Sequence, residues 1–339
     1  MSLSKSRYEY QLNLFRTALM ESISIHKSDQ KKIPGITLYE KNARTPLFQL
    51  QGLARIDSKI SRHKDLGAEW LDQFKKIEDA LGKYDYWVAM IQNNVKWQFP
   101  AEINAYFEQQ ANYNLGILEH LLVEFGWMTK EVNDYTYSES ALNKFDKSSK
   151  NAKWYKSNKE KIKLLKFYRD ELLEISEKIE SKELDLNELE LGIHELRRKL
   201  RWIGIYSSAL NGKIALGKPS KNDALSKYVT KENIAVKFNQ LPINANEKEI
   251  VYFLPGGFYA MSELIKKIGD IKDQGICTHE MSLIGKMFGM SSAKIRTHLG
   301  SDYLSHASVV KLCNDLVNQY IVKDKILLHI ADYFDKQVK

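Results

Sequence analysis

Hydrophobic residues recur three and four positions apart along most of the chain, which is the spacing of helices that bury one face. This pattern predicts helices at 8–25, 48–63, 70–92, 101–125, 156–182, 184–210, 258–272, 282–288, 291–299, 305–322 and 325–338. Alternating patterns typical of strands are nearly absent, and one short extended piece is expected at 250–254. The predicted fold class is all-α, with two antiparallel helical bundles related by a weak internal repeat.

Polar stretches set the expected boundaries between these helices. Residues 26–45 are predicted to form a loop, and residues 129–151, rich in Ser, Asn and Lys, a linker. We therefore expect an N-terminal helical bundle at 1–150 and a C-terminal helical bundle at 151–339. The second bundle carries a loop-rich insertion near 217–257, which ends in a turn predicted at Pro255-Gly256-Gly257.

The segment 184–210 is the central helix of this prediction. Asp185 is a candidate N-cap, Glu188 would close a capping box, and Asn211-Gly212 is a candidate stop. Its apolar residues fall on one helical stripe, which we expect to be buried: Leu189, Ile193, Leu196, Leu200, Ile203 and Leu210.

A second stripe on this helix is basic. It consists of residues at positions i, i+3, i+4 and i+7, namely His194, Arg197, Arg198 and Arg201. Leu191 and Trp202 flank the stripe, so these cations lie in partly apolar surroundings and require anions nearby. The anion is either a carboxylate of the protein, such as that of Glu190, or an external phosphate. The sequence leaves both alternatives open.

The first half of the chain holds a related pattern. A polar-basic stripe on the helix at 48–63 contains Gln51, Arg55, Lys59 and Arg62. The segments 71–85 and 261–273 align when Gly82 is placed over Gly269, and each follows a helix with a basic stripe. This alignment is the basis for the weak internal repeat.

The residues from Ile193-His194-Glu195-Leu196-Arg197 through Arg201 resemble the signature helix of the conserved histidine α-helical (CHAD) family. Ile268-Gly269-Asp270-Ile271-Lys272-Asp273 is similar to the ending of a later helix in that family. The resemblance implies two bundles related by a pseudo-two-fold axis around a basic cavity that holds inorganic polyphosphate. The implied anion ligands are His194, Arg197, Arg201 and Lys272. The first half departs from the family pattern, because Gln51 takes the place of the histidine and Asp85 follows Gly82 one position early.

Composition narrows the function classes only in part. The chain has 339 residues, with 51 Lys and Arg against 43 Asp and Glu, so its net charge of +8 suits polyanionic partners without requiring them. Two cysteines, the lack of a secretory-type apolar segment and the lack of a membrane-spanning run predict a cytoplasmic protein without membrane association. No P-loop, dinucleotide-binding or metalloprotease motif is present, so we expect no catalysis, cofactor or metal site, although missing motifs do not exclude an enzyme.

The first hypothesis is binding of a polyanion, foremost inorganic polyphosphate or another phosphate-rich ligand, in a basic cavity between the bundles. The candidate polyanion ligands are His194, Arg197, Arg198, Arg201, Lys272, Arg55, Lys59 and Arg62. The alternative is a DNA-binding regulator with a helix-turn-helix-like segment at 282–299, whose reading helix would present Lys294, Arg296 and His298. A third alternative is a scaffold whose arginines pair with its own acids. The sequence does not indicate the oligomeric state.

Overall fold

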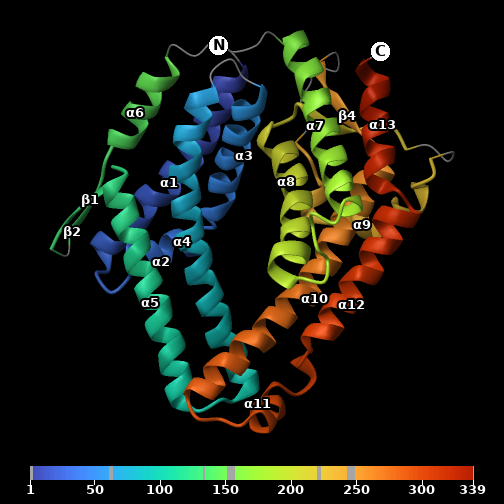
Figure 1. The fold of residues 1–339 in the computed structure, drawn as a ribbon. Coiled ribbons are helices and arrows are strands. Elements are labelled where there is room, and N and C mark those ends of the chain that lie inside the picture. The colour runs from blue at the N-terminus through green and yellow to red at the C-terminus, as the bar shows by residue number, and fades with distance from the viewer. Residues whose placement is uncertain are drawn as a thin grey trace. The chain divides into compact units, whose positions relative to one another are not determined.

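The structure, a computed structural model, describes residues 3–60, 64–132, 134–150, 157–219, 223–242 and 249–338. The chain divides into two compact units, Met1–Tyr155 (unit 1) and Lys156–Lys339 (unit 2). Helices form most of each unit, and the described strands form two short pairs (Figure 1). The predicted all-α fold class is thus confirmed.

Unit 1 is built on three long helices that follow one another in the chain. Helix α3 packs against α4, and α4 packs against α5. Phe15, Phe74 and Phe107 are fully buried in its core, and Trp127 packs edge-on against Phe15 at 4.9 Å between ring centroids. The elements of unit 1 are α1 (Leu3–Ser28), α2 (Pro34–Glu40), α3 (Arg44–Ile60), α4 (Lys64–Trp97), α5 (Ala101–Glu124), β1 (Met128–Glu131), β2 (Asp134–Tyr137) and α6 (Ser140–Ser149).

Two loop predictions in unit 1 were wrong. The polar stretch 26–45 contains α2, which begins with Pro34 in its first turn and buries Leu38. The stretch 129–151 contains the antiparallel pair β1–β2 and then α6, whose Phe145 packs against Tyr8 and Trp70. These short elements bury only a few apolar residues each, so tertiary packing fixes them rather than a periodic sequence signal.

Unit 2 has an aromatic core formed by residues far apart in the sequence. Helix α7 packs against α13, and the rings of Tyr168, Phe253 and Phe334 contact one another at centroid distances of 4.9–5.8 Å. The elements of unit 2 are α7 (Ser157–Glu180), η1 (Leu189–His194), α8 (Glu195–Ala209), β3 (Ile214–Leu216), η2 (Ser226–Tyr228), α9 (Lys231–Ala235), η3 (Lys237–Asn239), β4 (Val251–Phe253), α10 (Pro255–Met287), α11 (Ser292–Leu299), η5 (Gly300–Asp302), α12 (His306–Val317), η6 (Asn318–Lys323) and α13 (Ile326–Val338).

The central helix ends where predicted and begins later than predicted. After α8 the backbone takes positive φ at Asn211 and Gly212, which confirms the predicted stop. The helix begins at Leu189 with the π-helical turn η1, and no side chain caps it. The predicted capping box was wrong, because the Asp185 carboxylate accepts hydrogen bonds from the backbone and side-chain amides of Asn187 and so closes a turn before the helix.

Helix α10 corrects two further predictions. It is continuous over Pro255–Met287, whereas two separate helices and a break were expected. Gly256 and Gly257 lie in its first turn and form no separate turn. A Cβ atom at Gly256 would lie 2.3 Å from the carbonyl oxygen of Leu225, and one at Gly257 would lie 2.4 Å from Ile330. The two glycines therefore allow neighbouring chain segments to approach the start of the helix closely.

The insertion near 217–257 is anchored to the helices of unit 2 at both ends. Strands β3 and β4 pair in parallel, with Ile214 opposite Val251. The side-chain amide of Gln337 on α13 accepts a hydrogen bond from the Tyr252 backbone amide (2.9 Å) and donates one to its carbonyl (2.6 Å). This contact occupies the backbone groups of Tyr252, so the strand pair is held against the last helix.

Candidate functional site

The basic stripe of the central helix separates into a half-buried and an exposed part. His194 and Arg197 are half-buried, whereas Arg198 and Arg201 are exposed. The apolar stripe of the central helix explains this arrangement. Ile193, Leu196 and Leu200 are fully buried, and their burial turns the neighbouring His194 and Arg197 toward α10. The half-buried part is the candidate site.

His194 contacts a buried lysine of helix α10. Lys272 is 5% exposed, and its Nζ lies 3.2 Å from His194 Nδ1 and 2.7 Å from Asp273 Oδ1. An ammonium group can only donate hydrogen bonds, so Nδ1 is the acceptor. His194 is therefore neutral and carries its proton on Nε2. We call His194, Arg197, Lys272 and Asp273 the His194 cluster.

Arg197 lies on a glycine of the same helix. A Cβ atom at Gly269 would lie 2.7 Å from both Nε and an Nη atom of Arg197, so only glycine leaves room for the guanidinium in this position. Arg197 Nε donates to the carbonyl oxygen of Ile265 at 3.3 Å. Among the described residues, no carboxylate pairs with Arg197, and its other N–H groups have no protein acceptor.

Another glycine fixes the position of the helix start. A Cβ atom at Gly192 would lie 1.8 Å from the carbonyl oxygen of Asp185, which no side chain could tolerate. Gly192 thus lets the preceding loop cross η1 at backbone distance, and this contact holds the π-helical turn that ends at His194. Single π-helical turns of this kind are frequent at functional sites.

The electrostatic environment of the His194 cluster is positive. Burial and the nearby charge of Lys272 lower the pKa of His194, and Arg197 and Arg198 add to this effect, while Glu190 opposes it. Among the described residues, the acid that pairs with a cation of the cluster is Asp273, whose side chain is 61% exposed. A half-buried guanidinium, a buried ammonium and an imidazole N–H together offer donors to an oxyanion.

The other predicted polyanion ligands have different surroundings. Arg198 donates to Glu195 at 2.6 Å, and Arg201 is exposed on the next turn of α8. Arg55 and Lys59 belong to α3 of unit 1, half-buried and exposed, respectively. Arg62 lies outside the described residues. The structure brings together His194, Arg197 and Lys272 from the predicted set.

The alternative DNA-binding residues lie on α11. Ser291 caps this helix through a hydrogen bond from the Lys294 amide, and Ile295 and Leu299 are buried. Lys294 and Arg296 are exposed, and the Arg296 guanidinium stacks on Tyr303 at 5.0 Å from the ring centroid. His298 is half-buried. The helix before α11 is the end of the 33-residue α10, so the pair differs from the short hairpin that was predicted.

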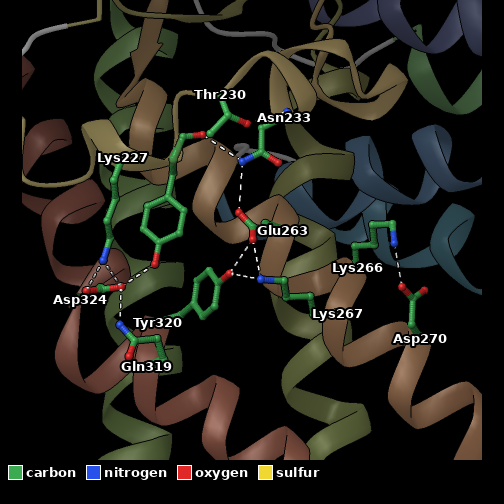
Figure 2. A network of polar contacts seen from close by, with 11 residues as sticks. Lys227, Thr230, Asn233, Glu263, Lys266, Lys267, Asp270, Gln319, Tyr320 and Asp324 are labelled. Atoms are coloured by element: carbon green, nitrogen blue, oxygen red, sulfur yellow. Dashed lines mark hydrogen bonds and ion pairs between the residues drawn. The ribbon is translucent and has the colours of Figure 1, made fainter.

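A larger polar network in unit 2 is fully paired. Figure 2 shows two carboxylates, Glu263 on α10 and Asp324 after η6, each surrounded by donors. Glu263 accepts from Asn233, Tyr320 and Lys267, and Asp324 accepts from Lys227, Tyr228 and Gln319. Burial alone would raise the pKa of both carboxyl groups, yet these hydrogen bonds lower it. The network clamps η2 and α9 of the insertion onto α10 and η6, which is a structural role.

Unit 1 contains a charged cluster that the sequence analysis missed. Arg44 donates two hydrogen bonds to Glu78 (2.7 and 3.1 Å) and one to Asp85 (2.7 Å), and Tyr39 donates to Asp85 (2.6 Å). A Cβ atom at Gly82 would lie 2.7 Å from the Arg44 guanidinium. The signal for this contact was an isolated glycine inside a helical pattern, which points to a close approach. The alignment paired Gly82 with Gly269 but predicted no arginine contact at either glycine.

The described part of the chain places no three His, Cys, Asp or Glu side chains in an arrangement that could hold a metal ion. None of the described helices combines the length and apolar character needed to cross a bilayer. Comparison with known proteins finds no matching family model, no matching curated protein and no matching solved structure.

Proposed function

We propose that the chain binds a phosphate-rich polyanion, with inorganic polyphosphate as the foremost candidate, at the His194 cluster and without catalysis. The observation that carries the proposal is Arg197, whose half-buried guanidinium has no carboxylate partner among the described residues. Its remaining N–H groups have no protein acceptor among the described residues, and a phosphate oxygen would complete its hydrogen bonds.

The neighbouring groups favour a chain of phosphates over a single small anion. His194, one helix turn before Arg197, and Lys272 on α10 offer further donors, and Arg198 and Arg201 continue the basic face along α8. A ligand with charges at regular intervals could contact these positions in turn. The resemblance to the CHAD family, which remains a prediction, points to the same ligand class.

The support for nucleic acid binding is weaker. Lys294 and Arg296 lie on an exposed face of α11, but Arg296 already stacks on Tyr303. No buried cation without an acid partner is found on the described residues of that helix. Duplex DNA is therefore the competing ligand in the experiment and not a second proposal.

Fluorescence anisotropy with end-labelled polyphosphate and with labelled duplex DNA, each at two salt concentrations, tests the proposal. We expect polyphosphate binding that weakens with salt, and a loss of about tenfold to a hundredfold in Arg197→Ala because charge-assisted hydrogen bonds are removed. Lys266→Ala is the matched control, since Lys266 lies on α10 with a 71% exposed side chain paired to Asp270. Equal losses in both variants, or DNA binding that disappears in Arg296→Ala alone, would overturn the proposal.

A further inference from the structure

The hydrogen bond between Lys272 and His194 fixes one protonation state of the imidazole. While Lys272 Nζ donates to Nδ1, this nitrogen cannot carry a proton. A protonated His194 would place an Nδ1–H group and a second positive charge against the buried ammonium. The unliganded cluster therefore holds a neutral histidine whose Nδ1 is occupied by a donor.

Charged groups from each element packed against η1 determine how readily His194 takes up a proton. Helices α8, α10 and α12 pack against η1. The cations that act on the imidazole are Lys272 from α10 and Arg197 and Arg198 from α8, and the opposing acid is Glu190 of η1 itself. Asp273 pairs with Lys272, and α12 contributes the buried thiol of Cys313 beside Lys272. Cations outnumber acids around His194 and disfavour its protonation, so a bound anion would favour the protonated imidazole.

Building on the proposed function, we propose that polyanion binding at the His194 cluster is coupled to the uptake of a proton by His194. The phosphate oxygens attract the Lys272 ammonium away from Nδ1, and this nitrogen then accepts a proton from solvent. The resulting imidazolium donates a hydrogen bond to the anion. The N–H bond that forms at Nδ1 replaces the bond that held the proton to hydronium or a buffer acid in solvent. No other bond forms or breaks, and the added proton balances part of the charge that the ligand brings.

This coupling makes affinity depend on pH in one direction. Burial and the charge of Lys272 lower the pKa of free His194, whereas a bound anion favours the charged imidazole and raises that pKa. Between the two pKa values, affinity is expected to increase by up to about tenfold for each pH unit that the solution is lowered. If His194 only positions Lys272 and takes up no proton, the affinity for polyphosphate changes with pH only through the ionisation of polyphosphate itself.

Calorimetric titration of the full chain with long-chain polyphosphate, in two buffers that differ in ionisation enthalpy, counts the protons taken up. Interior phosphate groups of a long chain stay ionised near neutral pH, so ligand ionisation contributes little. We expect uptake approaching about one proton per site near neutral pH in the wild type. His194→Gln is the matched variant, because its amide oxygen can still accept from Lys272; we expect it to bind polyphosphate without proton uptake.

Each result has a defined meaning. Polyphosphate binding without proton uptake in the wild type overturns the coupling but leaves the proposed function intact. Uptake that persists in His194→Gln assigns the proton to another group and also overturns it. A lack of polyphosphate binding at any pH refutes the proposed function, and the coupling with it. The ring nitrogen signals of His194 in NMR spectra provide a second measure, because Nδ1 should change from an unprotonated to a protonated shift as ligand is added.

Discussion

Each unit of the chain holds an arginine whose guanidinium lies on a helix glycine, and the two arginines have opposite surroundings. In unit 1, Arg44 lies on Gly82 of α4; in unit 2, Arg197 lies on Gly269 of α10. Arg44 has a carboxylate on either side along its partner helix, and Arg197 has none among the described residues. The same local contact therefore serves an internal ion pair in one unit and leaves a cation available to a ligand in the other.

The residues that flank the two glycines on their helices differ in charge. Four residues before the glycine, unit 1 has Glu78 and unit 2 has Ile265; three residues after it, they have Asp85 and Lys272. In both units the later residue contacts a polar atom of an aromatic ring: the Tyr39 hydroxyl donates to Asp85, and His194 Nδ1 accepts from Lys272. Two changes on the partner helix thus convert an acidic environment into a basic one. The difference shows that the arginine and glycine set the geometry, while their neighbours determine whether the arginine has a carboxylate partner.

The largest expected difference between the two arginines is the loss in the free energy of unfolding when each is replaced by alanine. Arg44→Ala leaves the Glu78 carboxylate, 8% exposed, without its partner, and we expect a loss of about 3 kcal/mol in the free energy of unfolding because the buried charge is uncompensated. Arg197→Ala strands no acid, so we expect a loss below about 1 kcal/mol. Urea unfolding followed by circular dichroism measures both values.

The double variant Arg44→Ala with Glu78→Gln is the control for this prediction, since it removes the stranded charge and should recover part of the lost stability. Five of the six tryptophans belong to unit 1 and the sixth is Trp202 of unit 2, so tryptophan fluorescence in a Trp202→Phe background reports the unfolding of unit 1 separately. Equal losses for the two arginine variants would show that the contrast in their surroundings has no energetic consequence.

The two glycines should respond to the same substitution with opposite signs. In Gly269→Ala the new methyl group displaces a guanidinium held by one carbonyl, so we expect a small gain in stability from helix propensity, up to about 1 kcal/mol, together with weaker polyphosphate binding. In Gly82→Ala it displaces a guanidinium held by two carboxylates, so we expect a loss of about 1 kcal/mol.

Thermal unfolding and the anisotropy assay together test the glycine prediction. Gly116→Ala on α5 is the control, because a Cβ atom there would meet nothing within 4 Å. It should gain stability from helix propensity without an effect on binding. A loss of stability in Gly269→Ala as large as that in Gly82→Ala would mean that Arg197 is held as firmly as Arg44, which contradicts the proposed site.

The sequence predicted the long helices and much of the candidate site, and its errors have a common physical origin. Periodic apolar residues identified the central helix, and Asn211-Gly212 identified its end. Its start was missed because Asp185 bonds to its own loop, a choice that depends on the close approach of that loop to Gly192. The break predicted in α10 was wrong because tertiary packing carries the helix through Gly275, where a Cβ atom would contact Val309 at 2.4 Å.

The two arginine contacts depend on tertiary packing, which the spacing of residues in the sequence does not reveal. The sequence alignment paired Gly82 with Gly269, two glycines that both lie against an arginine in the structure, but it did not predict these contacts. The contact between Arg44 and Gly82 was missed, since Arg44 lies at the very start of α3 and reaches Gly82 only through tertiary packing. Which charges neutralise which arginine depends on contacts between segments tens of residues apart, and spacing does not encode these.

The pH dependence of stability should give the smallest effect and should differ in direction between the units. Burial and the charge of Lys272 lower the pKa of His194 below the ordinary histidine value of 6.5, so just below that pH the unfolded chain binds a proton that the folded chain does not. The stability linked to His194 is therefore present above about pH 6.5 and is lost as the pH falls toward the lower, folded-state pKa.

In unit 1, burial and Asp85 raise the pKa of Tyr39 from 10.0 to about 12, so its contribution is present below about pH 10 and is lost as the pH rises toward 12. Urea unfolding across pH should accordingly show an acid-side loss that is smaller in His194→Gln and an alkaline-side loss that is smaller in Tyr39→Phe. Unchanged acid sensitivity in His194→Gln would mean that Lys272 does not hold the imidazole neutral, and the difference in charge between the two clusters would then lose its main support.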